Sequence, residues 1–204
     1  MSNENTFLNI LNEKKEDLEA IKKLIMDNKD LINTEFNINN NSKIITYSPL
    51  TYCIDNKLSE LSIFLIEHGA NINYKTYPDE DYPLLLACKY NLEDVVKKLL
   101  LYDNLDINCL NKKNETCYHI LLYNKNVTLY NLIIDHVKKK ANNDLNNIND
   151  NNNNNKEKEK EKYNNNKKKT IINNISFTIP FEYKNNYINS QPGKLIILFN
   201  IFYL

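Results

Sequence analysis

The chain of 204 residues contains no Arg, no Trp and only two Gly, and each scarcity excludes a class of site. With Gly69 and Gly193 alone, it cannot form the Gly-rich loop that holds nucleotide or dinucleotide phosphates. Without Arg, it has no bidentate clamp for carboxylates, phosphates or guanine edges. Its four Cys follow no apolar leader, so they do not predict a disulfide framework. These absences argue against nucleotide-dependent enzymes and secreted disulfide scaffolds.

Asn is the abundant residue, at 40 of 204 positions, and the 26 Lys balance the 26 acidic residues. A bias toward Asn, Lys, Ile and Tyr is typical of AT-rich coding sequence, so abundance alone is not a sign of function. The charge is nevertheless distributed unevenly. Residues 1–137 have a net charge of −6, from 14 Lys and 20 acidic residues, whereas residues 138–204 have a net charge of +6, from 12 Lys and 6 acidic residues. Composition therefore divides the chain near residue 137.

The second part is low in complexity. Residues 138–170 consist mostly of Asn, Lys and Glu, and they contain too little apolar surface to offset the entropic cost of folding, so we expect a disordered linker. Residues 171–204 have no clear assignment. Segment 175–183 alternates like a short strand and is either a docking peptide or a cover for the edge of the first part. The apolar end, 195–204, is shorter than the about 20 residues that a bilayer span needs. The expected compartment is intracellular and cytoplasmic.

The first part has an internal period. Similar segments begin every 34 residues, at Ser48-Pro49-Leu50, Tyr82-Pro83-Leu84 and Thr116-Cys117-Tyr118. Each is followed by a short apolar helix, a polar break and a second amphipathic helix, predicted over 58–67, 92–101 and 127–136. Pro suits the first position of a helix, and Ser and Thr suit the N-cap. One such helix pair cannot bury its apolar face alone, so the pattern predicts stacked repeats.

The period resembles that of the ankyrin repeat family. Ser48-Pro49-Leu50 stands where that family has Thr-Pro-Leu, and the run from His68 through Gly69-Ala70-Asn71-Ile72-Asn73 is similar to its closing Gly-Ala-Asp-Val-Asn. The resemblance implies an all-α helical solenoid of about four repeats over residues 1–137. Residues 1–42 would be a degenerate capping repeat with an Asn-rich loop, and residues 43–137 would be three repeats.

The chain departs from the family pattern at several places. In the turn between the two helices, where the family has Gly, it has Lys57, Asn91 and Lys125. A left-handed backbone costs Lys roughly 1 kcal/mol more than Gly. The third unit also replaces Pro and Leu by Cys117 and Tyr118. We therefore expect a modestly stable array that frays at its last unit.

Residues with reactive side chains are better explained by packing than by chemistry. His119 takes the place of the family's structural His, and Cys53 and Cys88 fall among small packed residues. Cys117-x-His119 does not meet zinc spacing rules. The acidic run 79–81 falls in a projecting hairpin, where we expect it to be exposed and mobile, without the burial that acid–base catalysis requires. We expect no catalytic residue, no metal and no cofactor.

The resemblance implies that a concave face, made of hairpin tips and first helices, binds a protein. Tyr is enriched among interface hot spots, so we expect the four Tyr of this face to be its main contacts. The predicted partner-binding residues are Tyr47, Asp55, Tyr77, Asp79, Glu80, Asp81, Lys89, Tyr90, Lys112, Lys113 and Tyr123.

The sequence thus predicts a non-enzymatic, monomeric adaptor or scaffold whose partner is another protein. The acidity of the repeats argues against specific nucleic-acid binding. Two alternatives stay open. The chain is a regulatory or targeting fragment of a larger enzyme system, or it is a peripheral membrane anchor that uses 138–169 and 195–204.

Overall fold

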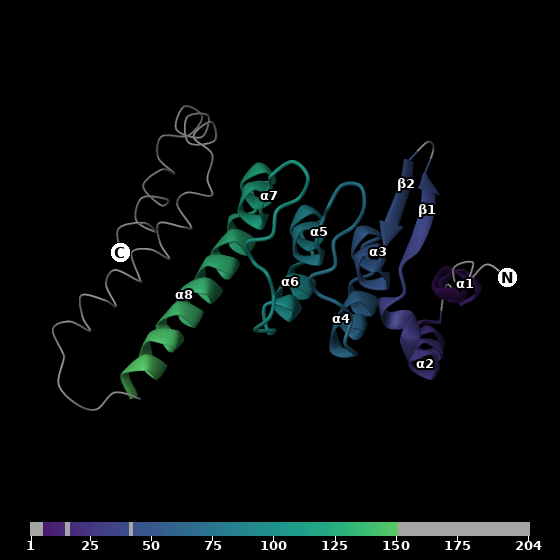
Figure 1. Ribbon diagram of the computed structural model, residues 1–204, viewed down its shortest axis with the longest axis horizontal. Coiled ribbons are helices and arrows are strands. Elements are labelled where there is room, and N and C mark those ends of the chain that lie inside the picture. The colour runs from purple at the N-terminus through teal and green to yellow at the C-terminus, as the bar shows by residue number, and fades with distance from the viewer. Residues whose placement is uncertain (1–5, 15–16, 41–42, 151–204) are drawn as a thin grey trace. The chain divides into compact units, whose positions relative to one another are not determined.

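The computed structural model describes residues 6–14, 17–40 and 43–150 (Figure 1). Within them the protein is mostly helical, with eight α-helices and one two-stranded sheet. The chain divides into two compact units, Met1–Leu129 and Tyr130–Leu204, of which the first contains the repeated elements.

Helix pairs recur through the first unit as the period of 34 predicts. Equivalent helices of successive pairs pack on one another, with α3 beside α5, α5 beside α7, and α4 beside α6 (Figure 1). Within each pair, α3 packs on α4 and α5 packs on α6. Their bounds are α3 Pro49–Asp55, α4 Ser59–Glu67, α5 Pro83–Lys89, α6 Glu93–Leu99 and α7 Cys117–Tyr123.

The first helices begin where the sequence predicted. Pro49 and Pro83 occupy the first helical position of α3 and α5. The Ser48 hydroxyl accepts a hydrogen bond from the Thr51 amide (3.2 Å), and the Thr51 hydroxyl accepts one from the Ser48 amide (2.9 Å). This reciprocal capping box satisfies amide groups that a helix start leaves without partners.

The turns between paired helices take the left-handed conformation at the three positions where the family has Gly. Lys57, Asn91 and Lys125 have φ of 60°, 57° and 56°. After Lys57, the amide of Leu58 donates to the Cys53 carbonyl (2.8 Å), and equivalent bonds follow Asn91 and Lys125. All three turns are therefore left-handed without Gly.

The core lies between neighbouring pairs. Leu50 and Ile54 of α3 and Leu84 and Leu85 of α5 are buried. The spacing of Leu92, Val95, Val96, Leu99 and Leu100 predicts one apolar face for the middle second helix. This face is confirmed at the last four residues, which are buried, whereas Leu92 is only half-buried. Neighbouring helix pairs thus bury apolar faces that a single pair would leave exposed to water.

Side chains of Asn connect the turns that close successive units. Asn73 donates from Nδ2 to the Asn104 carbonyl (2.7 Å) and accepts at Oδ1 from the Asp106 amide (2.9 Å). One unit earlier, Asn33 accepts at Oδ1 from the Asn71 amide (2.7 Å) and donates from Nδ2 to the Gly69 carbonyl (3.1 Å). Part of the Asn content therefore has a structural role.

The N-terminal region differs from the sequence prediction. It contains α1 (Thr6–Glu13), α2 (Leu18–Asp27) and a 3₁₀ turn (Lys29–Asn33), but much of the Asn-rich segment expected to be a loop forms the first strand of a β-hairpin. Its strands are β1 (Phe36–Asn40) and β2 (Lys43–Tyr47), which pair antiparallel.

The hairpin is held by aromatic packing. Phe36 pairs across the sheet with Tyr47, their rings 6.3 Å apart, and Phe36 stacks on Phe7 of α1 at 5.8 Å. Asn dominates the composition of β1 and conceals the alternation of Phe36 and Ile38, which explains why the strand was missed. The fold is mostly helical but not purely α.

The second unit contains most of α8, which is Val127–Asp150. The predicted second helix 127–136 forms its beginning, and the helix continues through 138–150, where a linker was expected. Extending an existing helix costs far less than nucleating one, and Lys, Ala and Leu favour helix. Residues 151–170, segment 175–183 and the apolar end 195–204 lie outside the described residues. Within the described ranges, no helix has the length and apolar character that a bilayer crossing requires.

Candidate functional site

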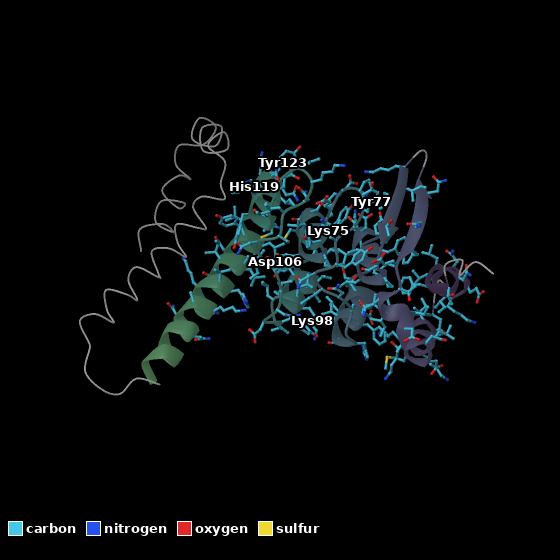
Figure 2. The ribbon with its side chains drawn as sticks, in the orientation of Figure 1. Lys75, Tyr77, Lys98, Asp106, His119 and Tyr123 are labelled. Atoms are coloured by element: carbon cyan, nitrogen blue, oxygen red, sulfur yellow. The ribbon has the colours of Figure 1, made fainter. Side chains whose placement is uncertain are left out.

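The predicted contact residues come together on one side of the first unit, which we term the tip face. It consists of segments 43–47, 75–82 and 109–116, which precede α3, α5 and α7, of the exposed sides of these helices, and of the turns that follow them at 56–57, 90–91 and 124–125. In Figure 2, Tyr77 and Tyr123 lie on this side, opposite Lys98 of α6. The tips are joined, because Thr46 and Tyr77 exchange two backbone hydrogen bonds (2.9 and 3.2 Å).

Two of the four predicted Tyr are engaged inside the protein. The Tyr47 hydroxyl donates to Asp55 Oδ2 and the Tyr90 hydroxyl donates to Asp55 Oδ1, both at 2.6 Å. Tyr47 is only 7% exposed, and Tyr90 is half-buried. Burial, followed by the bond to Asp55, raises the pKa of both phenols well above the usual range. Both phenols remain neutral donors, and Asp55 ties β2 and α5 to the end of α3.

The other two Tyr are available. Tyr77 is 67% exposed and Tyr123 is 76% exposed, although both are large and partly apolar. Ile44 of β2 is also exposed on the tip face, and the sequence prediction missed it because β2 was not recognised. The β-branched and aromatic residues of 44–47, which are Ile, Ile, Thr and Tyr, were the signal that would have found it.

The acidic run 79–81 is exposed at Asp79, as the sequence predicted, but its carboxylates are paired with Lys side chains of the same face. Lys43 Nζ lies 2.7 Å from Asp79 Oδ1, and Lys75 Nζ lies 3.1 Å from Glu80 Oε2. Each carboxylate at the tip therefore has a cation of the same face beside it.

Asp81 is half-buried at the base of the tips. Its Oδ1 accepts a hydrogen bond from Asn111 Nδ2 (3.2 Å), and Lys89 Nζ lies 4.0 Å from Oδ2. Burial raises the pKa of this carboxyl, while the bond from Asn111 acts in the opposite direction. The second and third tips are also joined, because the Lys112 amide donates a hydrogen bond to the Asp79 carbonyl (3.0 Å).

Several Lys of the tip face are exposed. Lys112 and Lys113 project from the third tip. Lys57 Nζ and Lys89 Nζ lie 5.3 and 5.2 Å from the centre of the Tyr90 ring. The sequence prediction did not include Lys57, because the period places it in the turn after α3 and gives no sign that its side chain reaches the next unit.

His119 and the Cys residues are part of the interior. His119 Nδ1 accepts from the Thr116 amide (3.0 Å) and lies 2.8 Å from the Thr116 hydroxyl, and burial lowers the pKa of the imidazole. All four Cys are free and buried, and burial raises the pKa of each thiol, to about 12 for Cys109. Such thiols are weak nucleophiles at neutral pH. No cluster of three or more His, Cys, Asp or Glu side chains able to hold a metal ion occurs in the described part of the chain.

Comparison with protein families supports the interpretation of the period. The model of the ankyrin repeat family matches residues 79–112, which span α5 and α6. Residues 79–112 are an ankyrin repeat. The units around this ankyrin repeat share its first helix, its left-handed turn and its stacking. No curated protein matches the chain significantly. Ankyrin repeats are typical of non-catalytic, protein-binding domains.

Proposed function

We propose that the ankyrin repeat at 79–112 is one of about four in a solenoid over residues 1–137, and that this array is a non-enzymatic adaptor or scaffold. Its partner is another protein, bound on the tip face. The observation that carries the proposal is the exposure of Tyr77 and Tyr123 on one face, because Tyr provides large contact area at low entropic cost.

The base beneath these side chains is held by hydrogen bonds, which favours binding. Asp55 fixes Tyr47 and Tyr90, and backbone hydrogen bonds join the first two tips. A face that is already ordered loses little conformational entropy when a partner docks, so more of the contact energy appears as affinity. The predicted contacts therefore have two roles, since Tyr47, Asp55 and Tyr90 position the face while Tyr77 and Tyr123 reach the partner.

Affinity capture of proteins from a lysate of the source cell, with the full chain as bait, tests the proposal. The variant bait carries Tyr77→Ala and Tyr123→Ala, while Tyr47 and Tyr90 stay unchanged because their loss would remove hydrogen bonds to Asp55. The control bait carries Leu101→Ala, since Leu101 is 74% exposed but follows α6, outside the tip face. Thermal melts establish that all baits are equally folded.

A protein retained by the wild-type and control baits should be lost from the Tyr variant. Truncation of a hot-spot side chain weakens binding by about 2 kcal/mol or more. If the Tyr variant retains every protein that the wild type retains, the tip face is not the binding surface.

A further inference from the structure

The tip face has the opposite charge to the region that carries it. Residues 1–137 have a net charge of −6, whereas seven Lys and five carboxylates give the tip face a net charge of +2. The Lys are Lys43, Lys57, Lys75, Lys89, Lys112, Lys113 and Lys125. The carboxylates are Asp55, Asp79, Glu80, Asp81 and Glu115.

The carboxylates of this face already have partners within the protein. Asp55 accepts from two phenols, and the three acidic residues of the second tip lie beside Lys43, Lys75 and Lys89. Glu115 accepts from Asn111 Nδ2 (3.0 Å). A partner would therefore meet little unpaired negative charge here.

Several Lys, by contrast, remain available. Lys57, Lys112 and Lys113 are exposed and form no ion pair with any residue that the structure describes. Lys89 Nζ is 4.0 Å from Asp81 Oδ2, the longest of the ion pairs described on this face, and the Lys89 side chain is half exposed. The unpaired charge on the tip face is therefore positive.

These Lys are connected through a continuous series of contacts. Lys57 and Lys89 both approach the Tyr90 ring, Lys89 approaches Asp81, and Asp81 accepts from Asn111, which precedes Lys112. Tyr123 adjoins them, because Asn124 Nδ2 donates to the Lys89 carbonyl (3.1 Å). We term this set the lysine–tyrosine patch, comprising Lys57, Lys89, Tyr90, Lys112, Lys113 and Tyr123.

We propose that the lysine–tyrosine patch binds an extended acidic segment of a partner protein, an inference that rests on the proposed function and specifies the partner's chemistry. The cations are spread over successive units, which suits a row of carboxylates better than a single phosphate. Packed helices of neighbouring units lie about 8–10 Å apart, and successive residues of an extended segment advance about 3.3 Å, so carboxylates about three residues apart can meet Lys of neighbouring units. Tyr123 provides contact surface beside the ammonium groups, and the Tyr90 ring lies under Lys57 and Lys89 and positions them. The chain's own residues 138–204 do not fit, since their net charge is +6.

The test is selection of peptides from a random display library, about twelve residues long, on the immobilised full chain. The patch variant carries Lys57→Glu, Lys112→Glu and Lys113→Glu. The control variant carries Lys14→Glu, Lys23→Glu and Lys29→Glu, three exposed Lys of the N-terminal region. Both variants change the net charge equally, and both keep residues 138–204, so general attraction of acidic peptides to that segment is the same in each.

Wild type and control should select peptides rich in Asp and Glu. A synthetic copy of a selected peptide should bind the patch variant about tenfold or more weakly than wild type, because like charges then face each other, and should bind the control within about twofold. Its affinity should also fall as added salt screens the exposed charges. Selection of neutral or basic peptides, failure to select any, or equal weakening in both variants overturns the inference.

Two further measurements separate the alternatives. If single-stranded DNA or phosphatidylserine vesicles bind in a patch-dependent manner and acidic peptides do not, the patch recognises phosphate and the inference is wrong. If capture of a protein depends on Tyr77 and Tyr123 but survives the patch variant, the proposed function stands and only the acidic segment is rejected. If neither set of substitutions alters capture, both proposals fail.

Discussion

At the scale of the residue, the same two positions of successive repeats form different kinds of contact. Tyr47 and Asp55 form a phenol–carboxylate hydrogen bond, and one period later Asp81 and Lys89 form a carboxylate–ammonium pair. In the third unit the residues are Glu115 and Tyr123; there Glu115 accepts from Asn111 while Tyr123 points to solvent. This change of chemistry leaves a large side chain exposed at the end of α7.

His119 should make stability depend on pH. Burial lowers its pKa below the ordinary 6.5, and Nδ1 must be unprotonated to accept from the Thr116 amide. Above pH 6.5 both the folded and the unfolded chain hold a neutral imidazole. As pH falls through 6.5, the unfolded chain takes up a proton more readily than the folded chain, so the free energy of unfolding decreases.

Urea unfolding near pH 7.5 and about pH 5.5 measures this effect. The stability advantage of the wild type over His119→Gln should be smaller at the lower pH. A difference between the two proteins that does not vary with pH contradicts the prediction.

At the scale of the element, the helices of the repeats are too short to be stable in isolation. Each of α3, α5, α6 and α7 has seven residues, whereas isolated helices shorter than about 12–15 residues are marginal in water. Their boundaries depend on local devices: Pro at the first position, capping boxes and left-handed turns. These devices are encoded within a few residues, so the sequence predicted most of the helix starts.

Lys125→Gly should stabilise the protein. Lys125 has φ of 56°, a conformation that strains a residue with Cβ but not Gly. Part of the gain is offset because Gly makes the unfolded chain more flexible, so we expect the free energy of unfolding to increase by about 0.5–1 kcal/mol. Urea unfolding measures it.

Lys23→Gly serves as the control for this substitution. Lys23 is exposed within α2, where Gly should lower the free energy of unfolding by about 1 kcal/mol. The two substitutions should therefore have opposite signs, and a loss of stability in Lys125→Gly would mean that the turn is not strained.

At the scale of the whole molecule, contacts between neighbouring repeats determine whether the repeats unfold together. In repeat proteins, stability is approximately the sum of weak units and the interfaces between neighbours. Here the interfaces combine the buried faces of adjacent helices with the Asn bridges between closing turns.

Asn73→Ala should weaken the coupling between two successive repeats. It removes the bonds to the Asn104 carbonyl and the Asp106 amide, so we expect the free energy of unfolding to fall by about 1–2 kcal/mol. Hydrogen exchange should accelerate at the amides of residues 104–108. Asn39→Ala, at an exposed position of β1, should change stability by less than about 0.5 kcal/mol. Equal effects of the two substitutions would show that the Asn73 bridge does not couple the units.

The sequence by itself determined the features that depend on local patterning. The period of 34, the starts at Pro49 and Pro83 and the buried face of α6 follow from residue type and short spacing. The three left-handed turns were expected only from the resemblance to the ankyrin repeat family, because Lys57 and Lys125 do not themselves favour that conformation. It did not reveal the β1–β2 hairpin, because Asn conceals the alternation and the stabilising contact is between Phe36 and the distant Phe7. It also placed the end of the last helix too early, because continuation of α8 depends on an existing helix rather than on a strong local signal.

Only the tertiary structure decided which predicted contact residues are available to a partner. Eleven residues were expected on one face, but Tyr47 and Tyr90 point to Asp55, and the acidic run lies beside Lys43, Lys75 and Lys89. Tyr90 lies 35 residues from Asp55 and Lys43 lies 36 residues from Asp79. Local sequence does not encode such pairings, because they arise when stacking of the repeats brings side chains of successive units within hydrogen-bond distance.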